Sequence, residues 1–321
     1  MFKQSLTAMQ VEAARERAAF ERDILSGLGQ APKSIPCKYF YDAIGSALFE
    51  QITFLDEYYP TRSEIEILTD HAGDIASRTG IGCVLVEFGS GSSTKTELLL
   101  AACPMITRYI PIDVSETALS IAKTRLATVF PALKAEPVLG DFTATVSLPA
   151  DTAQAPKLGF FPGSTIGNFS HEAAVDLLAL FRAVLGPNSR LIVGADLRKA
   201  PDVLVRAYDD AAGVTAAFNL NLLTRINREL NGTFDLARFA HLATYDETSG
   251  RIDMFLVSAV AQSVCVSGQT FYFAAGERIH TEVSQKYGVG EFQDLARRAG
   301  WRVGTLWTDS KQYFSVHEFY C

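Results

Sequence analysis

A glycine turn preceded by an acidic residue is the first part of this sequence that points to chemistry. Glu87-Phe88-Gly89-Ser90-Gly91 follows a short apolar run and precedes a segment of helical character. Glycines at such a turn let the backbone approach a ligand, and the helix that follows presents unpaired N–H groups. Thr94 stands where the dinucleotide fingerprint has its third glycine, and Glu87 would repel a pyrophosphate. The turn therefore suits a cationic ligand such as S-adenosylmethionine, which carries a sulfonium and an ammonium group, better than NAD.

Two more acids stand at the ends of the next two predicted strands. Asp113 lies 22 residues beyond Gly91, a spacing that suits a carboxylate accepting from both ribose hydroxyls. Asp141 is placed to accept from the exocyclic amine of an adenine, with Phe142 available to stack. Asp113 could instead cap the helix that follows it, and Asp141 could instead stabilise a turn. Acids at three successive strand ends nevertheless favour a cofactor site. The residues assigned to this site are Glu87, Gly89, Ser90, Gly91, Lys95, Asp113, Asp141 and Phe142.

A sheet of buried parallel strands is needed to bring these residues together. Short apolar runs typical of such strands occur at 83–88, 108–113, 137–139, 158–161 and 190–196. Helices are predicted between them, from 94 to about 100, from 115 to about 130, and from an N-cap at Ser170 to a stop at Gly186. This alternation favours a doubly wound α/β sheet.

The alternation fails on both sides of this block. Residues 1–60 give an amphipathic helix and an aromatic segment, and residues 198–286 give helices at 203–210, 216–230 and 236–239 followed by strands at 251–260 and 265–273. A helix at 290–299 and an antiparallel pair at 301–307 and 312–320 then return to the α/β pattern. We expect a sheet domain of residues 61–197 plus 287–321, and a discontinuous substrate lobe of residues 1–60 plus 198–286.

Composition excludes several classes of protein. The 321 residues carry a formal net charge of −7 and no cluster of Lys and Arg, which argues against a nucleic-acid surface. The longest apolar stretches, such as 98–102 and 255–260, are far shorter than the ~20 residues of a spanning helix. Charged residues within 1–21 leave no room for the apolar core of a signal peptide. We therefore expect a cytoplasmic protein that binds neither nucleic acid nor membrane.

The cysteines and histidines give no sign of a metal centre or of disulfides. The five cysteines are odd in number and include no C-x-x-C pair. The five histidines lack the spacing of metal ligands. Reduced thiols and the absence of a metal are the expectation.

Longer motifs outside the glycine turn make the chain recognisable. These motifs are Pro32–Ser34, Lys38–Asp42, Glu57–Arg62, Gly163–Asn168, Arg206–Thr215 and Thr281–Ser284. With them the chain resembles the histidine-specific Nα-methyltransferases of ergothioneine biosynthesis, from about residue 28 to the C-terminus. That family makes trimethylhistidine (hercynine) from L-histidine with three molecules of S-adenosylmethionine. The resemblance implies a Rossmann-like class I methyltransferase sheet domain with a second, discontinuous α+β substrate-binding lobe.

The resemblance also implies how the amino-acid end of the substrate is bound. Tyr58 and Tyr208 match positions whose phenols bind the carboxylate, and Asn168 matches the amide that binds the α-amine. Phenol donors suit a carboxylate because they hydrogen-bond it without forming an ion pair. Tyr41 matches a pocket aromatic near the amine, where its π face could favour a methylated ammonium by ~0.5–2 kcal/mol.

The imidazole end has its own implied set. Glu282 and Ser284 match the pair that binds the imidazole nitrogens, with Thr215 nearby and Met254 lining the same ring pocket. A carboxylate accepting from an imidazole N–H selects histidine, because an apolar ring would leave that carboxylate desolvated and unpaired.

The expected reaction is in-line attack of the neutral α-amine on the sulfonium methyl. Asn168 and Tyr41 are assigned the catalytic roles, with Asn168 orienting the lone pair, because no residue of the matched motifs stands out as a general base. Alternatives are an Nα-methyltransferase for another aromatic amino acid or a histidine derivative, and a non-catalytic sensor of S-adenosylmethionine or a metabolite. A nicotinamide oxidoreductase is disfavoured by Glu87. We expect a monomer whose partner is the small molecule L-histidine.

Overall fold

The computed structural model describes residues 8–90 and 94–321 and divides into two compact units. Unit 1 comprises Met1–Tyr58 and Ala200–Ser284, and unit 2 comprises Tyr59–Lys199 and Gln285–Cys321. The chain therefore passes from one unit to the other at 58/59, 199/200 and 284/285. The boundaries expected from the sequence, at 60/61, 197/198 and 286/287, each lie two residues from these positions.

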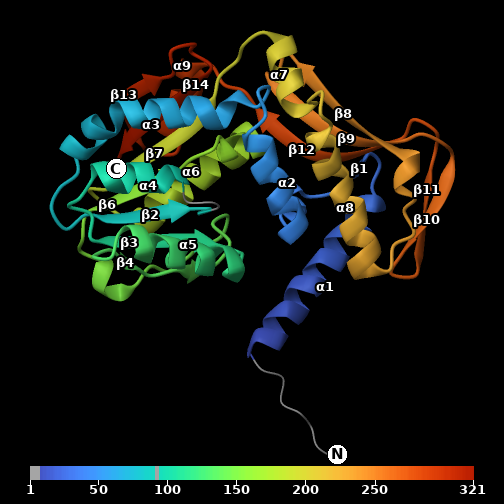
Figure 1. Ribbon diagram of the computed structural model, residues 1–321, viewed down its shortest axis with the longest axis horizontal. Coiled ribbons are helices and arrows are strands. Elements are labelled where there is room, and N and C mark those ends of the chain that lie inside the picture. Colours follow the sequence, from blue (N-terminus) through green and yellow to red (C-terminus); the bar gives the residue numbers. More distant parts are fainter. Residues whose placement is uncertain (1–7, 91–93) are drawn as a thin grey trace, which may run out of the picture. The chain divides into compact units, whose positions relative to one another are not determined.

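Unit 2 is built on an eight-stranded sheet (Figure 1). Its strand order is β13-β14-β7-β6-β2-β3-β4, and β5 also pairs with β3. Strand β14 runs antiparallel to β13 and β7, whereas the pairs from β7 to β4 are parallel. The strands are β2 Val84–Phe88, β3 Arg108–Asp113, β4 Lys134–Ala135, β5 Val138–Leu139, β6 Lys157–Phe161, β7 Arg190–Asp196, β13 Arg302–Thr308 and β14 Phe314–Tyr320.

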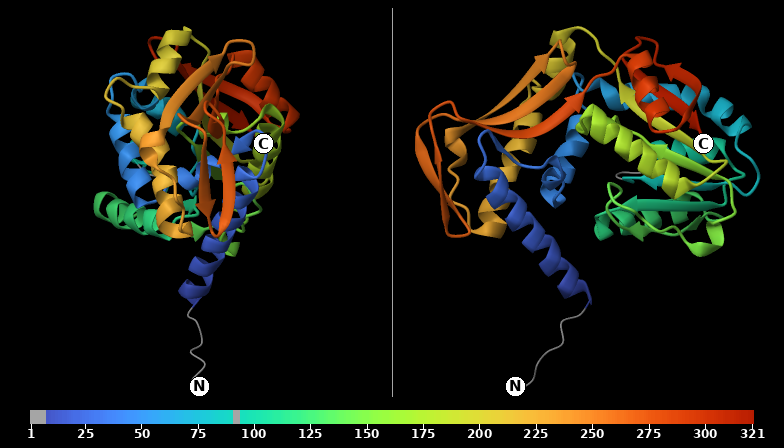
Figure 2. Two further views of the ribbon diagram at one scale, coloured as in Figure 1. Left: turned by 90° about the vertical axis from the view of Figure 1, so that its right-hand side faces the viewer. Right: turned by 180° about the vertical axis from the view of Figure 1, so that it is seen from behind.

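Helices cover both faces of this sheet because its central strands are apolar on both sides. One buried cluster joins α3, α4 and α5 to the sheet, and another joins α6 and α9 to the opposite face, seen from behind in Figure 2. Short 3-10 turns lie at η2 Ala150–Thr152 and η3 Thr165–Asn168. The helices are α3 Tyr59–Ser77, α4 Thr94–Ala102, α5 Glu116–Val129, α6 His171–Leu185 and α9 Val289–Arg298.

Unit 1 combines a four-stranded sheet of order β1-β12-β9-β8 with a separate hairpin, β10–β11 (Figures 1 and 2). Helix α8 packs on β8 and β9. The helical elements are α1 Ala8–Leu28, η1 Cys37–Phe40, α2 Ala43–Thr53, α7 Pro201–Tyr208, α8 Val214–Leu230 and η4 Leu236–Arg238. The strands are β1 Lys33–Ser34, β8 Phe239–Asp246, β9 Arg251–Ser258, β10 Gln262–Val266, β11 Gln269–Phe273 and β12 Arg278–Gln285.

Local signals placed most elements of unit 2 correctly. The predicted strands at 108–113 and 190–196 coincide with β3 and β7. Ser170 caps α6 by accepting from the amide of Ala173 at 3.3 Å, and the helix stops at Gly186, whose φ is 78°. The strand predicted at 137–139 is only the two-residue β5, with β4 as a separate piece before it.

Two predictions for unit 1 are wrong. The single strand expected at 265–273 is instead parts of β10 and β11, because Ser267 and Gly268 turn the chain with φ values of 47° and 78°. The helix expected at 236–239 is the 3-10 turn η4, and Phe239 already begins strand β8. Strand β12, which carries Glu282 and Ser284, was not predicted as a strand at all.

Candidate functional site

Adjacent strand ends bring the predicted cofactor residues of unit 2 to one edge of its sheet. Phe88 on β2 is in register with Ile112 on β3, and Asp113 is in register with Leu139 on β5. The amide of Gly89 donates to the carbonyl of Ile112 at 2.8 Å, so the glycine turn starts directly beside the end of β3. Gly91, also assigned to the cofactor, lies outside the described residues.

Gly89 leaves room that any other residue would fill. Its φ is 78°, and a Cβ added there would stand 3.3 Å from Cε1 of Phe142. Phe142 packs edge-on against Phe161, with ring centroids 5.4 Å apart. An aromatic ring beside backbone that carries no side chain leaves room for a flat group, such as the adenine of a nucleoside without phosphates. Ser90 is buried, and its hydroxyl has no hydrogen-bond partner within the described part of the chain.

Asp113 and Asp141 each use one carboxylate oxygen to hold their own turn. Oδ1 of Asp113 accepts from the amide of Ser115 at 2.9 Å. Oδ1 of Asp141 accepts from the amide of Thr143 at 2.8 Å and from its hydroxyl at 2.6 Å. The helix cap itself is Ser115, which accepts from Ala118 at 3.1 Å. The turn-forming roles and the predicted ligand-binding roles therefore do not compete, because Oδ2 of each acid takes no hydrogen bond from residues 8–90 and 94–321.

Glu87 lies behind the turn rather than on its surface. Its side chain is 1% exposed, and the Thr96 hydroxyl donates to both carboxylate oxygens at 2.7 and 2.8 Å. The phenol of Tyr109 donates to the same carboxylate. Burial raises the pKa of Glu87 to about 8, although Tyr109 and Thr96 act in the opposite direction. The carboxyl group thus links β2 to β3 and α4 through hydrogen bonds. Its contact with a cationic cofactor stays a prediction.

Lys95 is paired with an acid that the sequence did not single out. Its Nζ lies 2.5 Å from Oε2 of Glu64 on α3, and Glu64 is fully buried. The same carboxylate accepts from the amide of Gly163 at 2.9 and 3.0 Å. A Cβ at Gly194 would lie 2.2 Å from Glu64, so β7 needs a glycine to admit this acid. No local signal marks Glu64, because its partners are about 30 to 130 positions away.

Asn168 ends the 3-10 turn η3, which follows β6 at the same edge of the sheet. The turn is entered through Gly163, with φ 83°, and Ser164, with φ 57°. Asn168 is half-buried, and its side-chain amide makes no hydrogen bond with the described residues. An amide in this condition can accept from or donate to a ligand without first breaking an internal bond.

Apart from Asn168, the residues assigned to the amino-acid substrate gather in unit 1. The hydroxyl of Tyr208, at the end of α7, lies 2.8 Å from Oγ of Ser284 on β12. The rings of Tyr58 and Tyr208 meet edge to face at 6.3 Å. Phe49 lies between Tyr58 and Tyr41, with centroid distances of 6.1 and 5.6 Å. Four separate segments of the chain therefore meet around one set of phenol and hydroxyl groups.

Glu282 is the charged member of this set. Burial of the hydroxyl raises the pKa of Tyr41 well above its ordinary value, and the nearby Glu282 adds to the rise. Tyr41 as a whole residue nevertheless keeps 44% of its surface exposed. Burial, and again Glu282, raise the pKa of the Cys37 thiol to about 12. Cys37 is therefore a neutral thiol and not a nucleophile at neutral pH.

Thr215 and Met254 are buried on neighbouring elements of unit 1. Asp210 caps α8 by accepting from the amides of Val214 at 2.9 Å and Thr215 at 2.7 Å. Met254 on β9 is 1% exposed, and its carbonyl accepts from the Thr281 hydroxyl at 3.1 Å, next to Glu282. Asp210 thus stabilises the turn between Tyr208 and Thr215.

Sequence reasoning missed two residues that support Tyr208. His241 on β8 lies 2.8 Å from the Tyr208 carbonyl through Nε2 and 2.8 Å from Nδ2 of Asn219 through Nδ1. Because the same Asn219 nitrogen also donates to the Phe255 carbonyl at 3.1 Å, it faces His241 as a donor. Nδ1 of His241 is then the acceptor and Nε2–H donates to Tyr208. His241 could be read from the sequence as part of an alternating stretch, but no local pattern connects it with Asn219 on α8.

The described residues contain neither a group of metal ligands nor a helix able to span a membrane. Within residues 8–90 and 94–321, there is no group of three or more His, Cys, Asp or Glu side chains arranged to hold a metal ion. None of the helices described there is long and apolar enough to cross a membrane.

The sheet of unit 2 and the residues along its edge define the class of protein. A glycine turn follows the central strand β2, acids follow the next two strands, and β14 runs antiparallel between β13 and β7, so unit 2 is a doubly wound α/β domain with a ligand-binding edge. The chain belongs to the family of histidine-specific, S-adenosylmethionine-dependent methyltransferases, whose family model matches residues 20–321. The resemblance noted in the sequence is thereby confirmed.

Individual relatives agree with this family. The chain is 43% identical over 303 residues to histidine N-alpha-methyltransferase of Mycolicibacterium smegmatis, covering 93% of this chain and 94% of that protein. It is 33% identical over 294 residues to ergothioneine biosynthesis protein 1 of Neurospora crassa, covering 88% of this chain and 32% of that protein. Among solved structures, mitomycin 7-O-methyltransferase is similar with a TM-score of 0.48 at 15% identity, over 98% of this chain and 68% of the other.

Proposed function

We propose that the protein transfers three methyl groups from S-adenosylmethionine to the α-amine of L-histidine, giving trimethylhistidine for ergothioneine biosynthesis. The observation that carries the choice of substrate is the cluster in unit 1, where Tyr208 and Ser284 share a 2.8 Å contact and Glu282 lies beside Tyr41. These are the hydrogen-bonding groups that a polar, zwitterionic amino acid with an imidazole ring requires. Relatives that act on histidine support the same choice.

The roles of the residues follow from their chemistry. Tyr58 and Tyr208 donate phenol hydrogens to the substrate carboxylate, and Glu282 accepts from an imidazole N–H while Ser284 completes the contact with the ring. Asn168 binds the α-amine and directs its lone pair. The exposed face of Tyr41 stabilises the ammonium as methyl groups accumulate, by ~0.5–2 kcal/mol. Thr215 and Met254 close the ring pocket.

The sulfonium group of S-adenosylmethionine supplies each methyl group, and the chain supplies position and charge. Each transfer needs a neutral amine, so conversion of a protonated α-amine to a trimethylammonium releases three protons in total. The carboxyl groups of Asp113 and Asp141 hold the nucleoside, and Gly89 admits it next to Phe142. Positioning of the amine by Asn168, rather than a general base, is the proposed source of rate.

Incubation with S-adenosylmethionine and single amino acids, read by mass spectrometry, tests this proposal. Histidine should gain one, two and then three methyl groups, while tryptophan, tyrosine and phenylalanine gain none. Asn168→Ala should lower the rate and the affinity for histidine, and Glu282→Gln should weaken discrimination against other aromatic rings. Methylation of tryptophan in preference to histidine would reassign the substrate. Histidine binding without any methylated product would favour a sensor.

A further inference from the structure

A buried carboxylate in unit 2 collects more donors than any role so far explains. Asp196 ends β7 and is fully buried. The Tyr59 hydroxyl donates to its two oxygens at 2.9 and 2.8 Å, Lys199 donates to Oδ1 at 2.6 Å, and Lys286 reaches Oδ2 at 2.7 Å. Lys286 is itself fully buried, so both charges of this ion pair are shielded from solvent. We call these four residues the Asp196 cluster.

Each donor of the Asp196 cluster stands where the chain passes between the two units. Tyr59 is the first residue of unit 2, Lys199 is the last residue before the chain leaves it, and Lys286 is the second residue after the chain returns. Three connections that are far apart in the sequence are thus tied to one carboxylate. A carboxylate shared by three donors fixes their positions more firmly than three separate pairs would, because each hydrogen bond also restrains the carboxylate that the other two donors bind.

The main chain of Asp196 also holds the turn that carries Asn168. Its amide donates to Oγ of Ser164 at 2.9 Å, and its carbonyl accepts from the amide of Tyr287 at 2.9 Å. The Tyr287 hydroxyl in turn donates to the carbonyl of Ile166, at 3.3 Å, inside η3. Ser164 adopts a left-handed backbone with φ 57°, a conformation that a serine keeps only where surrounding contacts hold it.

The returning segment packs tightly against the same turn. A Cβ at Gly167, one residue before Asn168, would lie 2.8 Å from the carbonyl oxygen of Gln285. Gln285 and Lys286 are adjacent, so the segment that supplies a donor to Asp196 is also the one that packs on η3. The position of the Asn168 amide therefore depends on the Asp196 cluster through two independent routes, Ser164 and residues 285–287.

We propose that Asp196 is a positioning residue for methyl transfer, holding η3 in the conformation that directs the amide of Asn168 at the substrate amine. The inference rests on the proposed function, because it concerns the residue that binds that amine. Asp196 is fully buried and acts through its bonds to Ser164, Lys286 and Tyr287. Loss of its charge should misplace Asn168 while leaving the cofactor edge at β2 and β3 unchanged.

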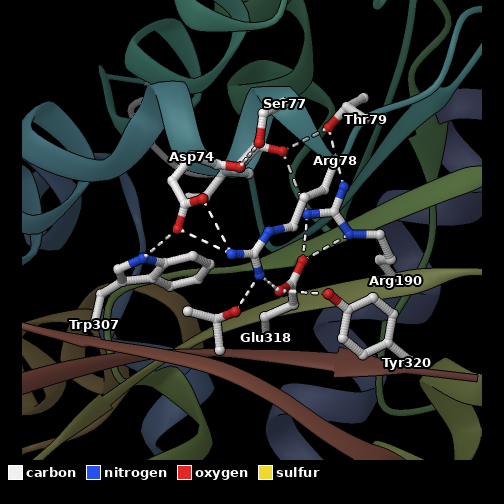
Figure 3. Close-up of polar contacts among 10 residues, drawn as sticks. Asp74, Ser77, Arg78, Thr79, Arg190, Trp307, Glu318 and Tyr320 are labelled. Atoms are coloured by element: carbon white, nitrogen blue, oxygen red, sulfur yellow. Dashed lines mark hydrogen bonds and ion pairs between the residues drawn. The ribbon is translucent and has the colours of Figure 1, made fainter.

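A second buried cluster in unit 2 provides a matched control. Glu318 on β14 is fully buried and accepts from Arg190, from Arg78 at 2.7 Å and from Tyr320 at 2.7 Å (Figure 3). Both clusters lie on the paired strands β7 and β14, at opposite ends, since Arg190 is in register with Tyr320 and Asp196 with Phe314. The Glu318 cluster links α3 to the sheet and, among the described residues, makes no hydrogen bond to η3. It matches the Asp196 cluster in burial and charge but not in location.

The experiment compares Asp196→Asn with Glu318→Gln in the full-length protein. Thermal unfolding, kcat, the KM values for histidine and S-adenosylmethionine, and the ratio of mono-, di- and trimethylated product are measured for both. Both variants should unfold at lower temperature. Asp196→Asn should also lower kcat/KM for histidine roughly 10- to 100-fold and leave partly methylated histidine, with binding of S-adenosylmethionine unchanged in calorimetry. Glu318→Gln should keep the wild-type kinetics at temperatures where it is folded.

Tyr59→Phe provides the second, milder variant, since it removes only the hydroxyl that donates to Asp196 and keeps the ring packed edge-on against Tyr313 at 5.3 Å. It should shift product ratios in the same direction as Asp196→Asn. Wild-type kinetics in both variants of the cluster, or equal kinetic losses in Glu318→Gln, would overturn the inference. Absence of methylated histidine with the wild-type protein would instead overturn the proposed function, and the inference with it.

Discussion

The hydroxyl of Tyr208 lies 2.8 Å from Oγ of Ser284, and this contact joins the end of α7 to strand β12 within unit 1. Both side chains are buried, with 9% and 3% of their surfaces exposed. One residue is assigned to the carboxylate of the substrate and the other to its imidazole. Under the proposed function, this contact fixes how far apart the two proposed recognition points lie, and an amino acid whose side chain has the length of histidine should satisfy both.

Replacing Tyr208 by phenylalanine should weaken histidine binding. The substitution leaves Oγ of Ser284 buried without this partner and removes a donor to the substrate carboxylate, a loss of about 1–2 kcal/mol, or roughly 5- to 30-fold in KM. Steady-state kinetics at saturating S-adenosylmethionine measure it. Tyr39→Phe is the control, because it removes a comparable phenol bond, to Asp23 at 2.7 Å, elsewhere in unit 1. Equal effects of the two substitutions would contradict the role of Tyr208.

Replacing Gly89 by alanine should impair binding of S-adenosylmethionine. A methyl group there would stand 3.3 Å from Phe142, and the φ of 78° is unfavourable for any residue with a Cβ by ~1–2 kcal/mol. Gly82 has the same φ of 78° but nothing within 4 Å of its added Cβ, so Gly82→Ala separates backbone strain from steric contact. Both variants should lose similar stability, and only Gly89→Ala should lose affinity in a calorimetric titration.

The raised pKa of Glu87 predicts a stability that depends on pH. An ordinary Glu ionises near 4.5 and Glu87 near 8, so between these values the folded protein binds more protons than the unfolded chain. The free energy of unfolding should therefore fall as pH rises through this window, by up to roughly 1.4 kcal/mol per pH unit from this group. In Glu87→Gln that contribution is absent, and urea unfolding at several pH values compares the two proteins.

The same pair of proteins tests whether Glu87 interacts with the cofactor. A cation bound nearby favours the ionised carboxyl group, so affinity for S-adenosylmethionine should increase as pH rises toward 8 in the wild-type protein. The increase should be missing in Glu87→Gln. If titrations give the same pH dependence for both, Glu87 is only a brace for the turn.

Local patterns predicted the sheet of unit 2 well because each strand there is a short apolar run closed by its own turn. The strands at β3 and β7 and the cap at Ser170 are of this kind. The hairpin β10–β11 differs from the single predicted strand because apolar residues stand on both sides of Ser267-Gly268, a dipeptide that turns the chain. Strand β12 was not predicted as a strand, and only its residues Thr281–Ser284 were singled out, through their motif.

The predicted site residues were chosen by spacing and resemblance, and neither shows which other side chains in the structure bind them. Glu87 is bound to Thr96 and Tyr109, and Lys95 is bound to Glu64. Such pairs are set by the register of strands and by helix packing, which no window of sequence contains. The Asp196–Lys286 pair spans 90 positions and becomes visible only when three separate segments converge.

Histidine recognition should weaken in acid through His241. Burial lowers the pKa of His241, although Asp209, with Oδ1 at 3.9 Å, and Asp210 act in the opposite direction. The neutral ring accepts from Asn219 at Nδ1, and a protonated ring would present a donor to a donor at that contact. The pKa of His241 in the folded protein lies below the ordinary 6.5, so between these two pKa values the unfolded chain binds more protons than the folded protein. The contribution of His241 to the free energy of unfolding is therefore complete above pH 6.5 and is lost as the pH falls toward the pKa of the folded state.

The kinetic consequence is a rise in KM for histidine at low pH, since a proton on Nδ1 repels the Asn219 amide, and the displaced ring shifts the Nε2–H that holds the Tyr208 carbonyl. Free histidine titrates in the same range, so the comparison must be made between proteins on one substrate. His241→Gln can retain a donor toward Tyr208 and an acceptor toward Asn219 but has no titrating ring. The variant should match the wild-type KM near pH 8 within a few-fold and show a smaller rise below pH 6.5. Identical pH profiles would show that His241 does not govern the position of Tyr208.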